Sequence, residues 1–204
     1  MIHLPPLSLY VHIPWCVKKC PYCDFNSHVA KDNIPEQAYI AALIADLKAD
    51  LHWVQGRKLH SIFIGGGTPS LFSGPAIEAI LVAAEDLIGF ESDIEITLEA
   101  NPGTFEQNKF ADFYSAGINR LSIGVQSFND SHLSRLGRIH DASQALRAIA
   151  TARSVGFDNF NIDLMHGLPN QTISQAKTDL AKAIDAGAVH ISWNQLTIDP
   201  NTNF

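Results

Sequence analysis

The sequence contains no apolar run near the ~20 residues that a membrane-spanning helix requires. Its first residues also lack the basic start and apolar core of a secretory signal. Basic residues are scarce, since 14 Lys and Arg stand against 21 Asp and Glu and give a formal net charge of −7. A nucleic-acid partner, which needs clustered basic residues, is therefore not expected. These absences favour a soluble, cytoplasmic protein with no transmembrane segment.

Cysteine is absent from the whole chain except for one short segment. All three cysteines, Cys16, Cys20 and Cys23, lie within eight positions, so no distant cysteine is available for a stabilising disulfide. Such a concentration is typical of a metal or redox site in a reducing compartment.

Short apolar segments alternate with amphipathic ones along the rest of the chain. The apolar segments predict six strands, at residues 7–13, 59–64, 94–99, 120–126, 159–164 and 189–196. The amphipathic segments predict helices at about residues 35–55, 75–88, 106–116, 141–155 and 173–186. This α/β alternation indicates a parallel sheet, either doubly wound or part of a (β/α) barrel, in one domain spanning residues 1–204. In both architectures the chemistry lies at the C-terminal ends of the strands.

The cysteines follow the first predicted strand directly, in a Cys-x3-Cys-x2-Cys spacing. Iron-sulfur clusters usually take one thiolate per iron, so three thiolates would leave one iron open to an outside ligand. Two alternatives compete. Cys20 and Cys23 alone match a glutaredoxin-type dithiol, although Cys16 would then be superfluous. A structural zinc site would need His12 or His28 as fourth ligand, whereas zinc sites usually combine two separated pairs of ligands.

Polar and glycine-rich residues follow the later strands. Gly65-Gly66-Gly67-Thr68-Pro69 allows close backbone approach to a ligand, but it lacks the spacing and the lysine of a phosphate-binding loop. Glu99 lies on the polar face at the end of its strand. Asp163 lies inside an apolar run, where an unpaired carboxylate would cost several kcal/mol, so a partner or ligand is expected. For a Glu or Gln taken alone, a solvated loop position remains the commoner outcome.

In this order, the motifs resemble those of radical S-adenosylmethionine (SAM) proteins, and over nearly the whole chain those of the HemW and HemN family. The matching segments are residues 9–14, the cysteine loop, and residues 65–69, 98–102, 120–128, 162–164 and 167–169. The resemblance implies a partial (β/α)6 TIM-like barrel of the radical SAM type. It also implies a [4Fe-4S] cluster on Cys16, Cys20 and Cys23, whose open iron is chelated by SAM and whose electron cleaves SAM to a 5'-deoxyadenosyl radical.

The same resemblance assigns residues to the SAM pocket. Glu99 would contact the ribose hydroxyls, and Tyr22, Cys23 and Asp24 would lie against the adenine side. The remaining contacts implied are Tyr10, Gly66, Gly67, Thr68, Gln126, Arg138 and Asp163. No catalytic residue is assigned beyond the cluster.

Two branches of this family fit, and Phe25 favours one of them. The oxygen-independent coproporphyrinogen III oxidases carry a further cysteine two residues after the third cluster ligand, where this chain has Phe25. The resemblance is therefore greater to the heme chaperones. It implies heme as cargo, heme-acceptor proteins and an electron donor as partners, and no certain enzymatic turnover. Because the chaperones extend well past residue 202, the chain is expected to be a radical SAM core that stops before their C-terminal, heme-associated region. His12, His28, His140 and His166 are formal heme-ligand candidates, although any single histidine is more often structural.

Overall fold

The computed structural model describes residues 4–31, 33–200 and 202, and a six-stranded parallel sheet forms its centre. The strands are β1 (Leu7–Ile13), β4 (Leu59–Gly66), β5 (Phe90–Ala100), β6 (Arg120–Gln126), β7 (Phe160–His166) and β8 (His190–Gln195). Their order in the sheet is β1-β4-β5-β6-β7-β8, and every neighbouring pair is parallel. All six predicted strands are confirmed, with β5 beginning four residues earlier than expected.

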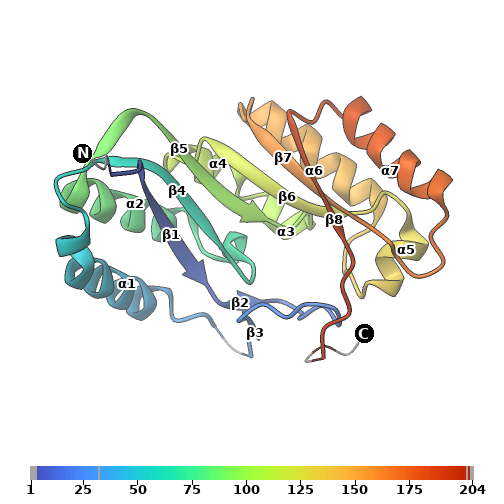
Figure 1. Cartoon of the computed structure of the whole chain (residues 1–204), viewed down its shortest axis with the longest axis horizontal. Coiled ribbons are helices and arrows are strands. Elements are labelled where there is room, and N and C mark those ends of the chain that lie inside the picture. The colour runs from blue at the N-terminus through green and yellow to red at the C-terminus, as the bar shows by residue number, and fades with distance from the viewer. Residues whose placement is uncertain (1–3, 32, 201, 203–204) are drawn as a thin grey trace.

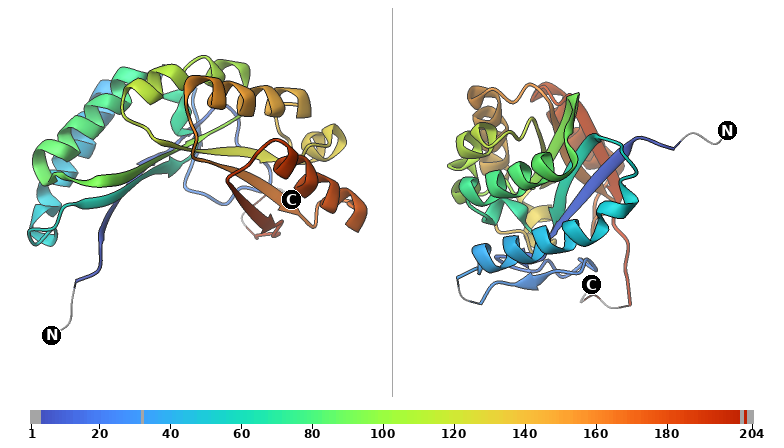
Figure 2. Two further views of the ribbon diagram at one scale, coloured as in Figure 1. Left: turned by 90° about the horizontal axis from the view of Figure 1, so that it is seen from above. Right: turned by 90° about the vertical axis from the view of Figure 1, so that its left-hand side faces the viewer.

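The strand order identifies the fold as a partial barrel. A doubly wound sheet reverses its order partway and carries helices on both faces, whereas this order follows the chain throughout. The sheet is an open arc, and its helices lie on the convex side (Figures 1 and 2). These covering helices are α1 (Glu36–Asp50), α2 (Gly74–Ile88), α4 (Phe110–Ser115), α6 (Ala142–Val155) and α7 (Ile173–Asp185). The partial (β/α)6 barrel is therefore confirmed.

The two faces of the sheet differ in polarity, because successive side chains on a strand point to opposite sides. The convex face is apolar, and Ile64, Leu98 and Ile123 are fully buried there beneath the helices. The concave face carries polar side chains instead, including Thr97, Ser122 and Asn161. The apolar face supplies the core that holds the strands in register, and the polar face forms the inner wall of the open barrel.

A small second sheet supports the cysteine segment. Strand β2 (Trp15–Cys16) pairs in parallel with β3 (His28–Val29), so the intervening residues form a closed loop at the C-terminal end of β1. The glycine-rich segment after β4 lies against this loop, because the backbone N–H of Thr68 donates to the Trp15 carbonyl oxygen at 2.7 Å. It leads into the short 3-10 helix η2 (Pro69–Leu71).

Several helix predictions were incomplete. The single helix expected at 106–116 is two helices, α3 (Thr104–Gln107) and α4. At the break Lys109 turns inward, and its Nζ donates to the Leu71 and Phe72 carbonyl oxygens at 2.6 and 3.1 Å. The helix expected at 35–55 ends as α1 and continues as the 3-10 helix η1 (Leu51–Trp53). Helix α5 (Asp130–Arg135) was not predicted, although the Asn129 side chain caps its first turn.

Within the described part of the chain, no helix has both the length and the apolar character to cross a membrane.

Candidate functional site

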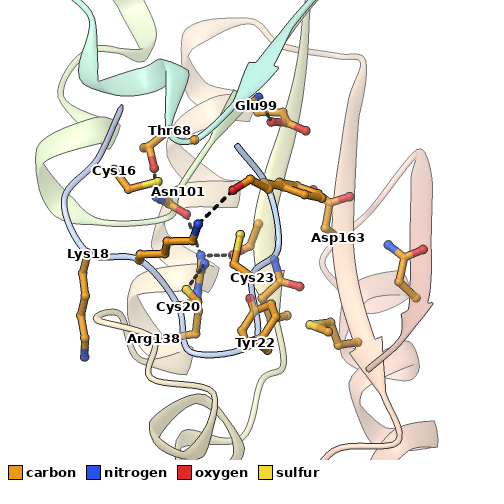
Figure 3. Close-up of a pocket in the computed structure, with 18 of the residues that line it drawn as sticks. Cys16, Lys18, Cys20, Tyr22, Cys23, Thr68, Glu99, Asn101, Arg138 and Asp163 are labelled. Atoms are coloured by element: carbon orange, nitrogen blue, oxygen red, sulfur yellow. Dashed lines mark hydrogen bonds between the residues drawn. The ribbon is translucent and has the colours of Figure 1, made fainter. Parts of the chain in front are cut away.

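A cavity of about 380 Å³ opens at the C-terminal ends of the strands, between the concave face and the cysteine loop (Figure 3). Every residue that the resemblance assigned to the cluster or to the SAM pocket lines it, except Tyr10. The predicted residues that line the cavity are Cys16, Cys20, Tyr22, Cys23, Asp24, Gly66, Gly67, Thr68, Glu99, Gln126, Arg138 and Asp163. Segments from the first 24 residues to position 163 thus converge on one space.

The cysteine loop is stabilised by hydrogen bonds within it and by one contact from strand β1. Lys19 Nζ donates to the Phe25 and Ser27 carbonyl oxygens at 3.0 and 3.2 Å. His12 Nε2, on β1, lies 2.8 Å from the Asn26 carbonyl oxygen. The loop conformation that brings the three thiols to the cavity is therefore fixed from two sides.

The three cysteines are free thiols, and burial raises the pKa of the Cys23 thiol. Among the residues that the structure describes, no three His, Cys, Asp or Glu side chains are grouped so as to hold one metal ion. His12 is a poor candidate for a metal ligand, because Nε2 contacts Asn26 and Nδ1 lies 2.8 Å from the Tyr10 hydroxyl. Both of its ring nitrogens are thus already used within the protein.

Three backbone N–H groups of the glycine-rich segment donate hydrogen bonds to other groups of the protein. The N–H of Gly66 donates to Glu99 Oε2 at 3.1 Å, that of Gly67 to the Ile13 carbonyl oxygen, and that of Thr68 to the Trp15 carbonyl oxygen. Phosphate-binding loops present a row of free N–H donors to their ligand. This segment does not, because these three N–H groups already have acceptors within the protein.

Two carboxylates occupy the inner wall. Burial raises the pKa of Glu99 to about 7, the Gly66 N–H opposes this rise, and the charge of Asp163 adds to it. Burial likewise raises the pKa of Asp163, although hydrogen bonds from Ser122 and Asn161 stabilise its charged form. Ser122 Oγ donates to Asp163 Oδ2 at 2.9 Å, and Asn161 Nδ2 to Oδ1 at 2.8 Å. The partner that the sequence required for Asp163 is this pair of neutral donors.

Arg138 reaches the cavity from the segment after α5 and links the strand ends to the cysteine loop (Figure 3). Its Nη2 donates to Asn101 Oδ1 at 2.6 Å and to the Gly124 carbonyl oxygen at 2.8 Å, and its Nη1 lies 3.5 Å from Cys20 Sγ. Its Nε is buried and has no hydrogen-bond partner. Burial also raises the pKa of the neighbouring Tyr22 hydroxyl, so this phenol is neutral beside the guanidinium.

Tyr10 and Gln126 differ from the other predicted residues. Tyr10 lies outside the cavity lining, where its ring stacks on Phe63 and its hydroxyl contacts His12. Gln126 has a φ of 67°, which is uncommon for a residue other than glycine. The register of β6 against β7 shifts between Ile123 and Gln126, so a bulge ends the strand at the cavity. Strained backbone of this kind is often found at functional sites.

The sequence reasoning missed part of the lining. Asn101 lies in the matching segment 98–102, two residues after Glu99, and Lys18 lies inside the cysteine loop. Both line the cavity, but neither was assigned a role. Asn194, Leu196 and Thr197 also line the cavity from β8 and the residues after it. Position at the C-terminal end of a strand was the signal that could have identified Asn101 and Asn194.

Comparisons with known proteins agree with this geometry. The family model of the radical SAM superfamily matches residues 10–183. The chain is 61% identical to a heme chaperone HemW from Haemophilus influenzae and 54% identical to one from Escherichia coli, over 100% of its length and 54% of theirs. It therefore spans about half the length of these curated relatives. The solved structure of the Escherichia coli coproporphyrinogen III oxidase HemN, described as a radical SAM enzyme, superposes with a TM-score of 0.86 at 31% identity. That superposition covers 96% of this chain and 45% of HemN.

Proposed function

Because the chain belongs to the radical SAM superfamily, we propose that Cys16, Cys20 and Cys23 bind one [4Fe-4S] cluster and that SAM occupies the adjoining cavity. The observation that carries the proposal is the convergence of three free thiols on a cavity whose lining also includes the Arg138 guanidinium and the carboxylates of Glu99 and Asp163. The whole protein is proposed to act as a heme chaperone of the HemW type.

The residues present fit a cluster with one open iron. Three thiolates bind three irons, and within the described residues no fourth cysteine exists to close the site. The buried, unpaired Nε of Arg138 is a donor without an acceptor, which suits an anionic group in the cavity. The residues therefore match a cluster and a ligand that carries a carboxylate.

Different parts of the cavity would then contact different chemical groups of SAM. The carbonyl oxygens of the glycine-rich segment suit a protonated amino group, and Arg138 suits a carboxylate. Glu99, ionised, would accept hydrogen bonds from the ribose hydroxyls. Asp163, Gln126, Tyr22 and the other predicted residues that line the cavity would enclose the rest of SAM. When bound, the cluster supplies the electron for reductive cleavage of the SAM sulfonium. The protein residues themselves orient SAM and exclude water.

Gly67→Ala should disturb the cluster site directly. A Cβ at Gly67 would lie 2.6 Å from the Trp15 carbonyl oxygen and 3.0 Å from Cys16 Sγ, so the two loops must separate. We expect a loss of about 1–3 kcal/mol in the free energy of unfolding and a fall in bound iron, measured by urea unfolding and iron analysis. Gly56→Ala is the matched control, because a Cβ there meets nothing within 4 Å and only its φ of 75° is unfavourable. Equal iron in both variants would contradict the proposed packing of the cluster loop.

The chaperone part of the proposal is supported by relatives rather than by the cavity. The two bacterial proteins reported above are named heme chaperones. We therefore propose that the whole protein binds heme, passes it to acceptor proteins and receives electrons from a donor in the cytoplasm. The chain itself is proposed to be the radical SAM core, with heme binding residing partly in the region that lies beyond it in the relatives.

A second function is supported by one finding, the similarity to the coproporphyrinogen III oxidase HemN. The two functions are separated by giving the anaerobically reconstituted full-length protein either coproporphyrinogen III or heme plus a heme-free acceptor hemoprotein. We expect heme transfer to the acceptor and no decarboxylated porphyrinogen. Robust formation of the decarboxylated product, without heme transfer, would overturn the chaperone proposal in favour of the oxidase.

A further inference from the structure

The guanidinium of Arg138 is held in place entirely by uncharged groups. Asn101 Oδ1 and the Gly124 carbonyl oxygen fix Nη2. In the described part of the chain, the ion pairs within 4.0 Å are His60 with Glu91 and Arg120 with Glu95, so no carboxylate forms an ion pair with Arg138. The buried Glu106 interacts with its charge only from farther away. Its positive charge is therefore fixed in the wall of the cavity without a direct ion-pair partner.

One group close enough to respond to that charge is a cysteine sulfur. Arg138 Nη1 lies 3.5 Å from Cys20 Sγ, and Asn101 sets this position by holding the other terminal nitrogen. A buried site has a low effective dielectric constant, so a fixed charge at this distance acts strongly.

Asn101 is an amide at a place where a carboxylate would preserve the geometry. Its Nδ2 donates to Thr68 Oγ1 at 3.2 Å, while its Oδ1 accepts from Arg138. An aspartate would still accept from Arg138, and the Thr68 hydroxyl can reverse and donate to its second oxygen. An amide at position 101 therefore leaves the positive charge of Arg138 without a direct partner, whereas a carboxylate there would neutralise it.

We propose that Asn101 is a positioning residue that directs the charge of Arg138 at the Cys20 sulfur and thereby raises the reduction potential of the cluster. Hydrogen bonds to cluster sulfurs and net local charge are the factors by which a protein sets such potentials. Reduction adds negative charge, so a fixed cation favours the reduced cluster. The inference rests on the proposed cluster, and it assigns to Arg138 a task beyond contact with SAM.

The test is a potentiometric titration of the reconstituted protein without SAM, followed by electron paramagnetic resonance. In Asn101→Asp we expect the ratio of reduced to oxidised cluster at a fixed potential to fall at least about tenfold, equal to a midpoint ~59 mV more negative for one electron. Iron content should stay as in the wild type, because the hydrogen bonds persist. Arg138→Gln, which removes the charge itself, should shift the midpoint in the same direction. This variant replaces Asn101→Asp in the test if Asn101→Asp does not fold.

Asn194→Asp is the matched control, because Asn194 lines the same cavity from β8 and makes no contact with Arg138. Its shift should be clearly smaller than that of Asn101→Asp. An unchanged midpoint in Asn101→Asp, or an equal shift in both aspartate variants, would overturn the inference. The proposed function would still stand in that case, provided that the wild type binds four irons and responds to SAM. A wild type that binds no cluster would overturn both.

Discussion

Replacing Glu99 by glutamine is expected to stabilise the cofactor-free protein at pH 8 and to weaken its binding of SAM. The rise in the Glu99 pKa from 4.5 to about 7 has burial as its main cause, so the folded protein holds an ionised carboxylate at pH 8 at a cost. At 1.36 kcal/mol per pKa unit this is at most about 3 kcal/mol. Partial exposure and solvent screening reduce it to about 1–2 kcal/mol.

The sign follows from proton binding. Between pH 4.5 and about 7 the folded protein keeps the Glu99 proton that the unfolded chain has lost. Stability from this group is therefore full below pH 4.5 and is lost as pH rises through 7. Glu99→Gln lacks this loss, so the two proteins should differ little at pH 5 and most at pH 8. Urea unfolding at both pH values measures the difference.

The affinity for SAM should change with pH, and with Glu99→Gln, in the opposite direction to the stability. Only the ionised carboxylate accepts from the ribose hydroxyls with full strength, so SAM affinity of the wild type should decline as pH falls below 7. Loss of charged hydrogen bonds, worth about 1.5–3 kcal/mol, predicts a ~10- to 100-fold weaker affinity in Glu99→Gln at pH 8. Glu78→Gln, on the exposed side of α2, is the control and should leave both measurements as in the wild type. A Glu99→Gln variant that is less stable at pH 8 would refute the pKa argument.

Substitution of any one of the three cysteines by serine should abolish the four-iron cluster. A cluster with one open iron has no spare thiolate, and within the described residues the chain offers no other cysteine. We expect iron to fall from about four per chain to below one, together with the loss of any spectral response to SAM. Iron analysis and electron paramagnetic resonance after anaerobic reconstitution provide the measurement.

His28→Ala separates the cluster from a zinc site. His28 is exposed on β3, near the loop, and was the remaining histidine candidate once both nitrogens of His12 were found to be engaged. The variant should keep its iron and its response to SAM. A dithiol site built on Cys20 and Cys23 alone would instead tolerate Cys16→Ser. A Cys16→Ser variant with the same metal content and the same response to SAM as the wild type would therefore contradict the three-thiolate proposal.

The positions of the strands along the chain, and the strand ends at which site residues lie, could be predicted from the sequence, because both follow from local patterns. Apolar segments such as residues 120–126 and 159–164 marked buried strands, and Glu99 and Asp163 marked the polar inner face. The partial barrel itself came from resemblance, since alternating strands and helices alone fit a doubly wound sheet equally well. The strand order decided between them only when the structure was known.

Contacts between distant segments could not be predicted. The inward turn of Lys109, which splits the expected helix at 106–116, depends on carbonyl oxygens nearly forty residues earlier. The link from Thr68 through Asn101 to Arg138 joins three separate loops. The left-handed backbone of Gln126 arises from a bulge between β6 and β7. Each feature depends on tertiary packing, for which periodicity and composition carry no signal.

The proposal that three cysteines hold a cluster open to SAM is tested most directly by one experiment on the wild-type protein. After anaerobic reconstitution and reduction, the electron paramagnetic resonance spectrum is recorded with and without SAM, and iron is counted in the same sample. We predict about four irons per chain and a spectrum that changes when SAM is added. A protein that binds zinc or no metal, or a four-iron cluster whose spectrum SAM leaves unchanged, would contradict the proposal.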